Sequence, residues 1–177
     1  MTFNAQPRLG NEILTLRPLA EADFVGLYLA ASSPETWAGH PKHDRWQRDV
    51  FESYFEFLLA TETTLVAIDN STGGAHEARI IGCSRYYPAP DIEDSMSIGF
   101  TFLDSYYWGG VWNRAMKTLM LDHAFETFDE IWLHIAPSNI RSQKAAQKIG
   151  AEYAYTANLA ISGEPTKTLC YRITKSY

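Results

Sequence analysis

The feature that most constrains this fold is a strand-then-helix unit that occurs twice in succession in the second half of the chain. In the first unit, the apolar segment SMSIGFTFL, residues 95–103, runs into the turn DSYYWGG, and an amphipathic helix is expected over about residues 110–126. In the second, the short buried strand IWLHIA, residues 131–136, leads into a helix over residues 139–149 that stops at Gly150. Two neighbouring strands that each deliver a helix N-terminus can grip an extended ligand between them.

The remaining segments predict a single mixed α+β domain over residues 1–177. An alternating strand at residues 13–19 precedes two helical segments, EADFVGLYLAA and DVFESYFEFLLA, and a hairpin TLVAIDNSTGGAHEARIIGCSRYYP with a polar, glycine-containing turn. Two last strands, over about residues 152–161 and 168–174, complete the order β-α-α-β-β-β-α-β-α-β-β. We expect about seven strands in a mostly antiparallel sheet, parallel only between the strands of the two units, with helices on both faces.

Composition narrows the class of partner. Fifteen basic and twenty-one acidic residues give a net charge of −6, which disfavours nucleic acid and suits a cationic or amine-bearing partner. No stretch approaches the roughly 18 apolar residues of a membrane span, and a cytoplasmic location is expected. Cys83 and Cys170 lie outside any cysteine–histidine cluster, so neither a metal site nor a disulfide is predicted.

The first unit carries two adjacent glycines before its helix. Gly109 and Gly110 allow a bulky anion to approach the backbone where the free N–H groups of a helix N-terminus point. Asn113 and Arg114 in the first helical turn add side-chain donors, so the segment resembles a phosphate cradle. The alternative is an ordinary strand-to-helix turn that uses glycine for a positive φ and binds nothing.

The second unit places two small polar residues on the opening turn of its helix. Asn139 and Ser142 are three residues apart, so both side chains can face the same edge of the sheet. The alternative is helix capping by Ser138 or Asn139, which accounts for one of these residues. Capping does not explain why the strand-then-helix arrangement occurs twice.

From LTLRPL to YRIT, nearly the whole chain resembles the GCN5-related N-acetyltransferases, and specifically the branch similar to ribosomal-protein N-acetyltransferases. The likeness is carried by LTLRPL, IIGCSRYY, SIGFTFL followed by YYWGGVWNRAMK, and NIRSQKAAQKIGA. It implies a three-layer fold whose fourth strand is bulged and splays from the fifth. It also implies acetyl transfer from acetyl-CoA, without a metal, to a primary amine of a small molecule or of a protein or peptide N-terminus. Assembly as a homodimer is allowed.

The resemblance assigns a coenzyme A site. Main-chain groups of the bulged strand would bind the pantetheine arm, the loop before the third helix would bind the pyrophosphate, Asn139 would hold the pantetheine, and Ser142 would lie near the sulfur. Val111 stands where relatives often have a second, spaced glycine, which leaves the loop geometry open. The implied cofactor-binding residues are Phe102, Leu103, Trp108, Gly109, Gly110, Val111, Asn113, Arg114, Asn139 and Ser142.

Direct attack on the thioester needs an oxyanion donor and an acid for the departing thiolate. For the oxyanion we expect a backbone N–H near Phe102 or Leu103. For the acid, many relatives have a tyrosine at the position that Ala146 holds here. We therefore expect Ser142 to donate the proton, with Tyr107 and Tyr153 as weaker alternatives.

The reaction also needs a base that takes a proton from the amine. Relatives often carry glutamate at the position of Ser97. Glu93, four residues earlier in the acidic segment DIED, can serve through a water if the strand reaches that far. The alternative for Glu93 is a solvated loop residue, since most surface carboxylates have no catalytic role.

The acceptor is expected at the segment ETWAGHPKHDRW, residues 35–46, between the first two helices. His40, with Asp44 four residues later, can act as a base or hold a carboxylate or amine of the substrate, because histidine titrates near neutrality. The alternative is that Trp37 and Trp46 anchor the core and the histidines are caps or satisfied side chains.

Two other classes of function remain open. A dinucleotide-dependent oxidoreductase would also use a strand, a glycine turn and a helix, with an acidic residue such as Glu130 about 20 residues later. The motif GxGxxG is missing, however, and Glu130 opens its strand instead of ending it. A non-catalytic acyl-CoA-binding module is the stronger rival, because the tyrosine and the glutamate of many relatives are both replaced.

Overall fold

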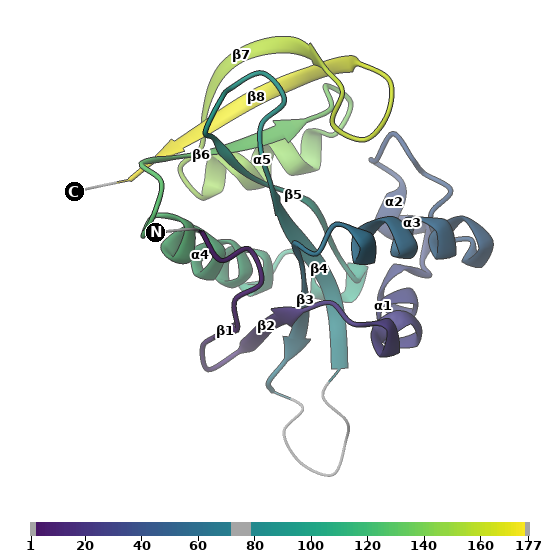
Figure 1. Ribbon diagram of the computed structural model, residues 1–177. Helices are drawn as coiled ribbons and strands as arrows, with labels where there is room; N and C mark the ends of the chain where they lie inside the picture. The colour runs from purple at the N-terminus through teal and green to yellow at the C-terminus, as the bar shows by residue number, and fades with distance from the viewer. Residues whose placement is uncertain (1–2, 72–78, 176–177) are drawn as a thin grey trace.

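The computed structural model describes residues 3–71 and 79–175, and its strands form one eight-stranded sheet in the order β1-β2-β3-β4-β5-β6-β8-β7 (Figure 1). The strands are β1 Leu9–Gly10, β2 Leu14–Pro18, β3 Thr64–Asp69, β4 Arg79–Tyr87, β5 Met96–Leu103, β6 Glu130–Ile135, β7 Glu152–Leu159 and β8 Thr166–Thr174. The helices are α1 Phe24–Ala31, α2 Pro34–Trp37, α3 Arg48–Ala60, α4 Trp112–Ala124 and α5 Ile140–Lys148.

The mixed α+β architecture expected from the sequence is confirmed, with two short additions. The extra strand β1 pairs with β2 through Leu9↔Leu16 and Gly10↔Thr15, so the sheet has eight strands where about seven were expected. The one-turn helix α2 is the other addition. Both are too short to produce a periodic pattern in the sequence. The predicted turn between β3 and β4 falls largely on residues 72–78, outside the described residues.

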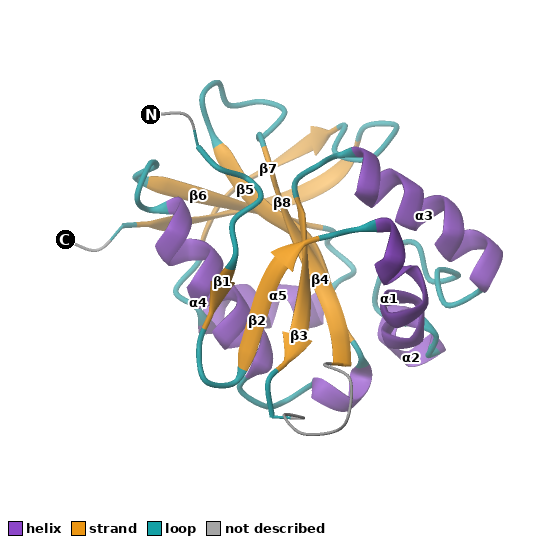
Figure 2. Ribbon diagram, turned by 60° about the horizontal axis from the view of Figure 1, so that its bottom comes forward, coloured by secondary structure: helices purple, strands orange, loops and turns teal. Residues whose placement is uncertain are grey.

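Helices cover both faces of the sheet (Figures 1 and 2). On one face, α1, α2 and α3 bury Leu27, Trp37 and Phe51 against inward-facing strand residues such as Val66 and Phe102. The opposite face carries a second apolar core that includes residues of α4 and α5, among them Met116, Met120, Leu121, Ala124 and Ala146. The apolar stripe of each helix is therefore buried against the sheet, which holds the helix N-termini at fixed positions relative to the strands.

The sheet opens between β5 and β6, the only parallel pair among the described strands. These strands pair at Met96↔Ile131 and Ser97↔Trp132 and nowhere beyond, so their carboxyl-terminal halves separate. We call this point the β5–β6 fork. On the other edge of β5, the pairs Cys83↔Phe102 and Arg85↔Gly99 show that β5 carries one residue more than β4 over this stretch.

That extra residue makes a β-bulge. Phe100 lies within it and has a φ of 52°, a left-handed conformation that is costly for a non-glycine residue. A bulge bends its strand, which is how β5 turns away from β6. The bulged and splayed strand implied by the sequence resemblance is confirmed. Beyond Ser97, no other described strand pairs with the edge of β5 that faces β6.

Candidate active site

The loop between β5 and α4 is open at its glycines. Gly109 has a φ of 74°, which favours glycine, and a side chain built on it would meet no atom within 4 Å. A β-carbon on Gly110 would lie 3.5 Å from Trp112 Cδ1, an ordinary contact. Val111 has a φ of −83°, so the loop does not require a glycine at the position where relatives often have one.

No side chain in the described part of the chain caps the N-terminus of helix α4. Val111 is its N-cap residue and accepts no bond from the helix through its side chain. Within the described residues, no protein acceptor meets the backbone N–H groups of residues 112–114. These groups and the positive end of the helix dipole face the open glycine loop, the arrangement that binds phosphate groups.

The two side chains predicted to assist this loop differ in position. Asn113 is half-buried, and its amide makes no hydrogen bond within the described residues. Arg114 is exposed, and its Nη2 donates to the carbonyl of Lys148 at 3.4 Å, so its guanidinium turns toward the end of α5. Asn113 is thus the freer of the two donors at the cradle.

The N-terminus of α5 has a side-chain cap, and Asn139 provides it. Asn139 Oδ1 accepts from the backbone N–H of Ser142 at 3.2 Å, and the residue is 8% exposed. The capping alternative is therefore confirmed for Asn139. Ser142 is half-buried, and its hydroxyl forms no hydrogen bond with the described residues. Capping accounts for one member of the pair and leaves the Ser142 hydroxyl available at the helix N-terminus.

A stacked pair joins the two strand-then-helix units. The Arg141 guanidinium carbon, in the first turn of α5, lies 3.7 Å from the centre of the Trp108 ring, which precedes α4. Trp108 Nε1 donates to the carbonyl of Leu103 at 3.0 Å, and Arg141 Nη2 donates to the carbonyl of Thr36 at 3.1 Å. The end of β5 and the N-termini of α4 and α5 are thereby brought together, as the repeated unit predicted.

The residues predicted to supply main-chain groups, Phe102 and Leu103, lie at the end of β5 beyond the fork. Their side chains face opposite cores, and the Phe102 ring packs 4.9 Å from that of Trp37. The carbonyl of Leu103 is occupied by the Trp108 indole. A backbone oxyanion donor at either residue remains a prediction.

Neither alternative tyrosine has an unengaged hydroxyl at the fork. The buried Tyr107 donates to Asp69 Oδ2 at 2.9 Å, and burial, together with that carboxylate, raises its pKa to about 12. Tyr153 lies on β7, is 56% exposed, and shares a 2.9 Å hydrogen bond with Thr156. Ser142 remains the candidate acid because its hydroxyl is at a helix N-terminus beside the fork.

Glu93 and Ser97 lie toward the start of β5. Glu93 is exposed in the loop before the strand, while the bulge lies near the other end, about 20 Å of extended chain away. The structure therefore does not bring Glu93 together with Gly109 or Asn139. Ser97 forms the last β5–β6 pair, is fully buried, and its hydroxyl has no partner within the described residues.

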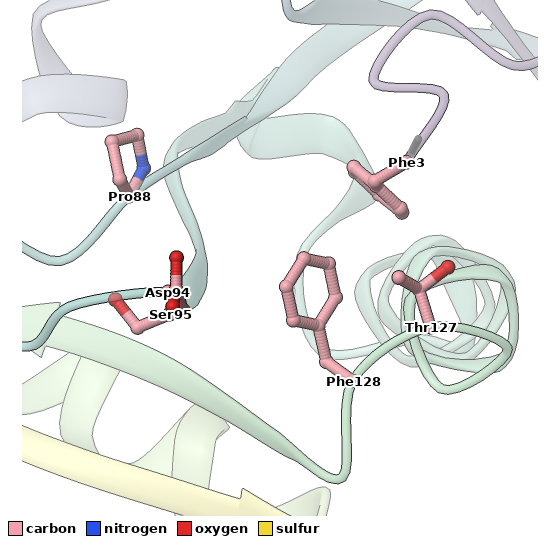
Figure 3. Close-up of a pocket in the computed structure, with 6 residues that line it drawn as sticks. All are labelled: Phe3, Pro88, Asp94, Ser95, Thr127 and Phe128. Atoms are coloured by element: carbon pink, nitrogen blue, oxygen red, sulfur yellow. The ribbon is translucent and has the colours of Figure 1, made fainter. Parts of the chain in front are cut away.

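Glu93 lines a surface hollow of about 210 Å³ together with Asp94, Asp129 and Glu130. A neighbouring hollow of about 420 Å³ has Pro88, Asp94 and Ser95 on one side and the rings of Phe3 and Phe128 on the other (Figure 3). Both hollows are at the start of β5, so they lie apart from the glycine cradle and the fork.

The predicted acceptor segment lies against the N-terminus of α5. A β-carbon on Gly39 would be 3.8 Å from Asn139 Oδ1. His40 Nδ1 accepts from the backbone N–H of Lys42 at 3.0 Å, and burial, reinforced by the nearby Arg45, lowers the pKa of His40 to about 4. His40 is therefore neutral at pH 7 and a weak base.

The other expectations for residues 35–46 have different outcomes. Within the described residues, no hydrogen bond or ion pair joins His40 to Asp44, and a role for His40 toward the substrate remains a prediction. Trp37 is 2% exposed and belongs to the core, as the structural alternative held. Trp46 is 37% exposed and does not belong to the core.

A buried lysine beneath the bulge was not anticipated from the sequence. Lys117 is 6% exposed, and its Nζ donates to Thr101 Oγ1 at 2.6 Å and to Ser84 Oγ at 3.3 Å. Within the described residues it has no carboxylate partner, and burial lowers its pKa to about 7. A signal was present, because Lys117 falls at the spacing of the apolar face of α4, with Met120, Leu121 and Ala124.

Two arginines on the α1–α3 face also lack a carboxylate partner in the described chain. The guanidinium carbon of Arg45 lies 3.6 Å from the centre of the Tyr54 ring. That of Arg85, a β4 residue paired with Gly99, lies 4.7 Å from the centre of the Phe100 ring. The surface beside the fork is therefore locally cationic and aromatic, although the net charge of the chain is negative.

Along residues 3–71 and 79–175, no helix is long and apolar enough to cross a bilayer. No group of three or more potential metal ligands occurs in the same ranges.

Comparison with known proteins places this geometry in a family. The model of the acetyltransferase (GNAT) domain matches residues 14–152, most of the chain. Curated proteins gave no match.

Solved structures share the fold. A GCN5-related N-acetyltransferase from Brucella melitensis superposes with a TM-score of 0.76 at 14% identity, over 96% of this chain and 79% of that one. The ribosomal-protein-S5-alanine acetyltransferase from Vibrio fischeri gives 0.64 at 19% identity, over 96% and 97%. RimJ from Mycobacterium smegmatis, solved with CoA-disulfide, gives 0.63 at 18% identity, over 95% and 86%. Together with the match of the family model over most of its length, this likeness shows that the chain belongs to the GNAT family of acetyltransferases.

Proposed function

We propose that this protein transfers the acetyl group of acetyl-CoA to a primary amine, on a small molecule or at the N-terminus of a protein or peptide, by direct attack of the amine on the thioester. The observation that carries the proposal is the β5–β6 fork with two helix N-termini beside it, joined by the stack of Trp108 and Arg141. The uncapped N-terminus of α4 suits the pyrophosphate, and the unpaired edge of β5 suits the amide groups of pantetheine.

The test combines calorimetry with a turnover assay on the full chain. Titration with CoA should give a dissociation constant in the micromolar range or below, and acetyl-CoA should be consumed in the presence of at least one member of a panel of primary amines and peptides. Tight CoA binding without turnover on any amine would support a non-catalytic acyl-CoA-binding module instead. Absence of CoA binding would contradict both functions.

The Ser142 hydroxyl is the candidate acid for the departing thiolate, and Ser142→Ala tests it. We expect kcat to fall roughly 10²-fold while CoA affinity changes little, because the interaction strengthens only as charge develops on sulfur. Asn139 already provides the cap through its own side chain, so the melting temperature should stay close to that of the wild type. An unaltered kcat would remove Ser142 from the mechanism, and loss of CoA affinity with kcat preserved would make it a ground-state contact.

The unpaired arginines beside the fork support an acceptor that carries a carboxylate close to its amine. Phenylalanine and phenethylamine differ only in that carboxylate, and their ring suits the aromatic surroundings of Arg85. We expect kcat/KM to favour phenylalanine by about tenfold or more, as a charge-assisted hydrogen bond allows. Arg85→Met should bring the ratio near one, whereas Arg172→Met, at a surface ion pair with Glu130, should leave it unchanged. Equal rates for both amines in the wild type would contradict this acceptor class.

A further inference from the structure

A tyrosine and a histidine meet across the middle strand of three. Tyr87 on β4 and His134 on β6 are joined by a hydrogen bond of 3.0 Å between Tyr87 Oη and His134 Nδ1. Between their strands lies β5, and there the residue is Gly99. A β-carbon on Gly99 would stand 2.9 Å from Tyr87 Oη and 2.8 Å from Tyr87 Cε1, so only glycine leaves room for the pair.

The position of His134 is set by the fork. The last β5–β6 pair is Ser97↔Trp132, and His134 comes two residues later on the same face of β6 as Trp132. It is the first residue on that face after the strands separate. On β5 the residue two positions beyond Ser97 is Gly99, and the described β5–β6 pairing ends before it.

The other ring nitrogen of His134 is unsatisfied. Nε2 is buried and has no hydrogen-bond partner within the described residues. A buried polar atom without a partner lowers the stability of the fold, and a catalytic role is one of the explanations for such atoms in native structures. The Tyr87 bond holds the ring through Nδ1, which leaves Nε2 as the ring nitrogen without a protein partner among the described residues.

Ionisable groups on three sides face this imidazole. Tyr87 contacts it from β4, and Cys170 on β8 pairs with it in the sheet. The charge of Asp91, which accepts from the hydroxyl of Tyr155 on β7 at 2.8 Å, favours the imidazolium, but burial dominates and lowers the pKa of His134. The imidazole is therefore neutral at pH 7, the state in which it can accept a proton.

We propose that His134 is the general base of the acetyl transfer, with Nε2 taking the proton of the attacking amine, and that Tyr87 positions the ring. This assignment rests on the proposed function, and it replaces neither the cradle nor Ser142. Of the two bases expected from the sequence, Glu93 lies toward the other end of β5 from the bulge, and Nδ1 of His40 already accepts from the backbone N–H of Lys42.

The lone pair of the neutral amine forms a bond to the thioester carbon, and Nε2 accepts the proton that the nitrogen loses, directly or through one water. The carbon–sulfur bond then breaks, and its electron pair leaves with the sulfur of CoA, which takes a proton from the Ser142 hydroxyl or from solvent. Ser142 regains its proton from solvent, and the imidazolium of His134 returns its proton to solvent. For Nε2 to carry the lone pair, Nδ1 must carry the hydrogen and donate it to Tyr87 Oη. Removing the tyrosine hydroxyl therefore weakens the control of the tautomer without removing the base.

The experiment measures kcat, KM and the pH profile of kcat/KM for the best amine in the panel, using the full-length wild type and three variants. His134→Gln should lower kcat about 10²-fold, leave the dissociation constant of CoA within about twofold, and abolish the acidic limb of the profile. Tyr87→Phe should lower kcat about tenfold. Its kcat/KM profile should keep an acidic limb, but at a shifted pH. His123→Gln, a histidine bonded to the carbonyl of Asn4 on the opposite face, should behave as the wild type.

A direct titration covers the case in which His134→Gln does not fold. The pKa of the His134 imidazole, followed by NMR in the wild type, should coincide with the acidic limb of kcat/KM below pH 6.5, because activity is lost as Nε2 becomes protonated. A His134→Gln enzyme with kcat within threefold of the wild type and the same limb would overturn the assignment, as would a limb that does not match the titration. A wild type that binds CoA and acetylates no amine would instead overturn the proposed function, and the base with it.

Discussion

Replacing Gly110 with glutamate should abolish coenzyme A binding, raising its dissociation constant by about 10³-fold or more. The glutamate would place a negative charge in front of the uncapped N-terminus of α4, where the pyrophosphate is expected. Juxtaposed like charges cost several kcal/mol, and each 1.4 kcal/mol is about a factor of ten in affinity. Calorimetric titration with CoA measures the change directly.

The fold should tolerate this substitution, which makes the result interpretable. A β-carbon at Gly110 meets only an ordinary contact with Trp112, so the melting temperature should stay near that of the wild type. Gly110→Gln separates bulk from charge and should weaken binding less. Gly10→Glu places the same charge on the short edge strand β1, with only ordinary contacts around the new β-carbon, and should leave CoA affinity unchanged. If Gly110→Glu binds CoA as the wild type does, the loop is an ordinary turn.

Lys117→Met should change how stability depends on pH, with an effect of about 10³-fold on the unfolding equilibrium. Burial lowers the pKa of Lys117 in the folded protein to about 7, from an ordinary value of 10.5. Between these values the unfolded chain binds more protons than the folded one, so wild-type stability rises with pH. The rise is about tenfold per pH unit from pH 7 upward, and below pH 7 the cost of burying the ammonium is constant.

Methionine has a similar volume and no charge, so the unfolding free energy of the variant lacks the pH-dependent cost of burying an ammonium group. The variant should be more stable than the wild type near pH 6, and the difference should shrink steadily as the pH approaches 10. Denaturant unfolding at intervals between pH 6 and 10 measures it, and comparing the two curves cancels the other titrating groups. Lys144→Met, an exposed lysine on α5, is the matched control and should follow the wild type. Parallel curves for Lys117→Met and wild type would mean that the ammonium is hydrated or paired.

The sequence alone determined the succession of elements and the position of the glycine loop before α4. Hydrophobic periodicity depends on neighbours in the chain, so the strand before Leu103 and the helix after Gly110 could be predicted within a few residues. The turn glycines and the polar opening of α5 are likewise local features. They were sufficient to predict that two helix N-termini meet beside a pair of parallel strands, which the stack of Trp108 on Arg141 confirms.

Only the tertiary structure decided which side chains meet at the β5–β6 fork. Glu93 lies in the loop before β5, at the end of that strand away from the bulge. His134, Gly99 and Tyr87 come from three strands and meet because the sheet registers place them side by side. No sequence period encodes a contact between strands that are far apart in the chain.

The tertiary structure also decided where charged side chains gather and which of them are buried. A net charge of −6 predicts an acidic surface on average, yet Arg45 and Arg85 gather on the face beside the fork. Lys117 follows the apolar spacing of α4, but only the packing of that helix on the bulged strand removes its ammonium from water and gives it hydroxyl partners. The sequence by itself determined where backbone donors would be presented, because helix ends are local. The fold decided which groups could titrate or transfer protons there, because desolvation and contact depend on every element that packs around them.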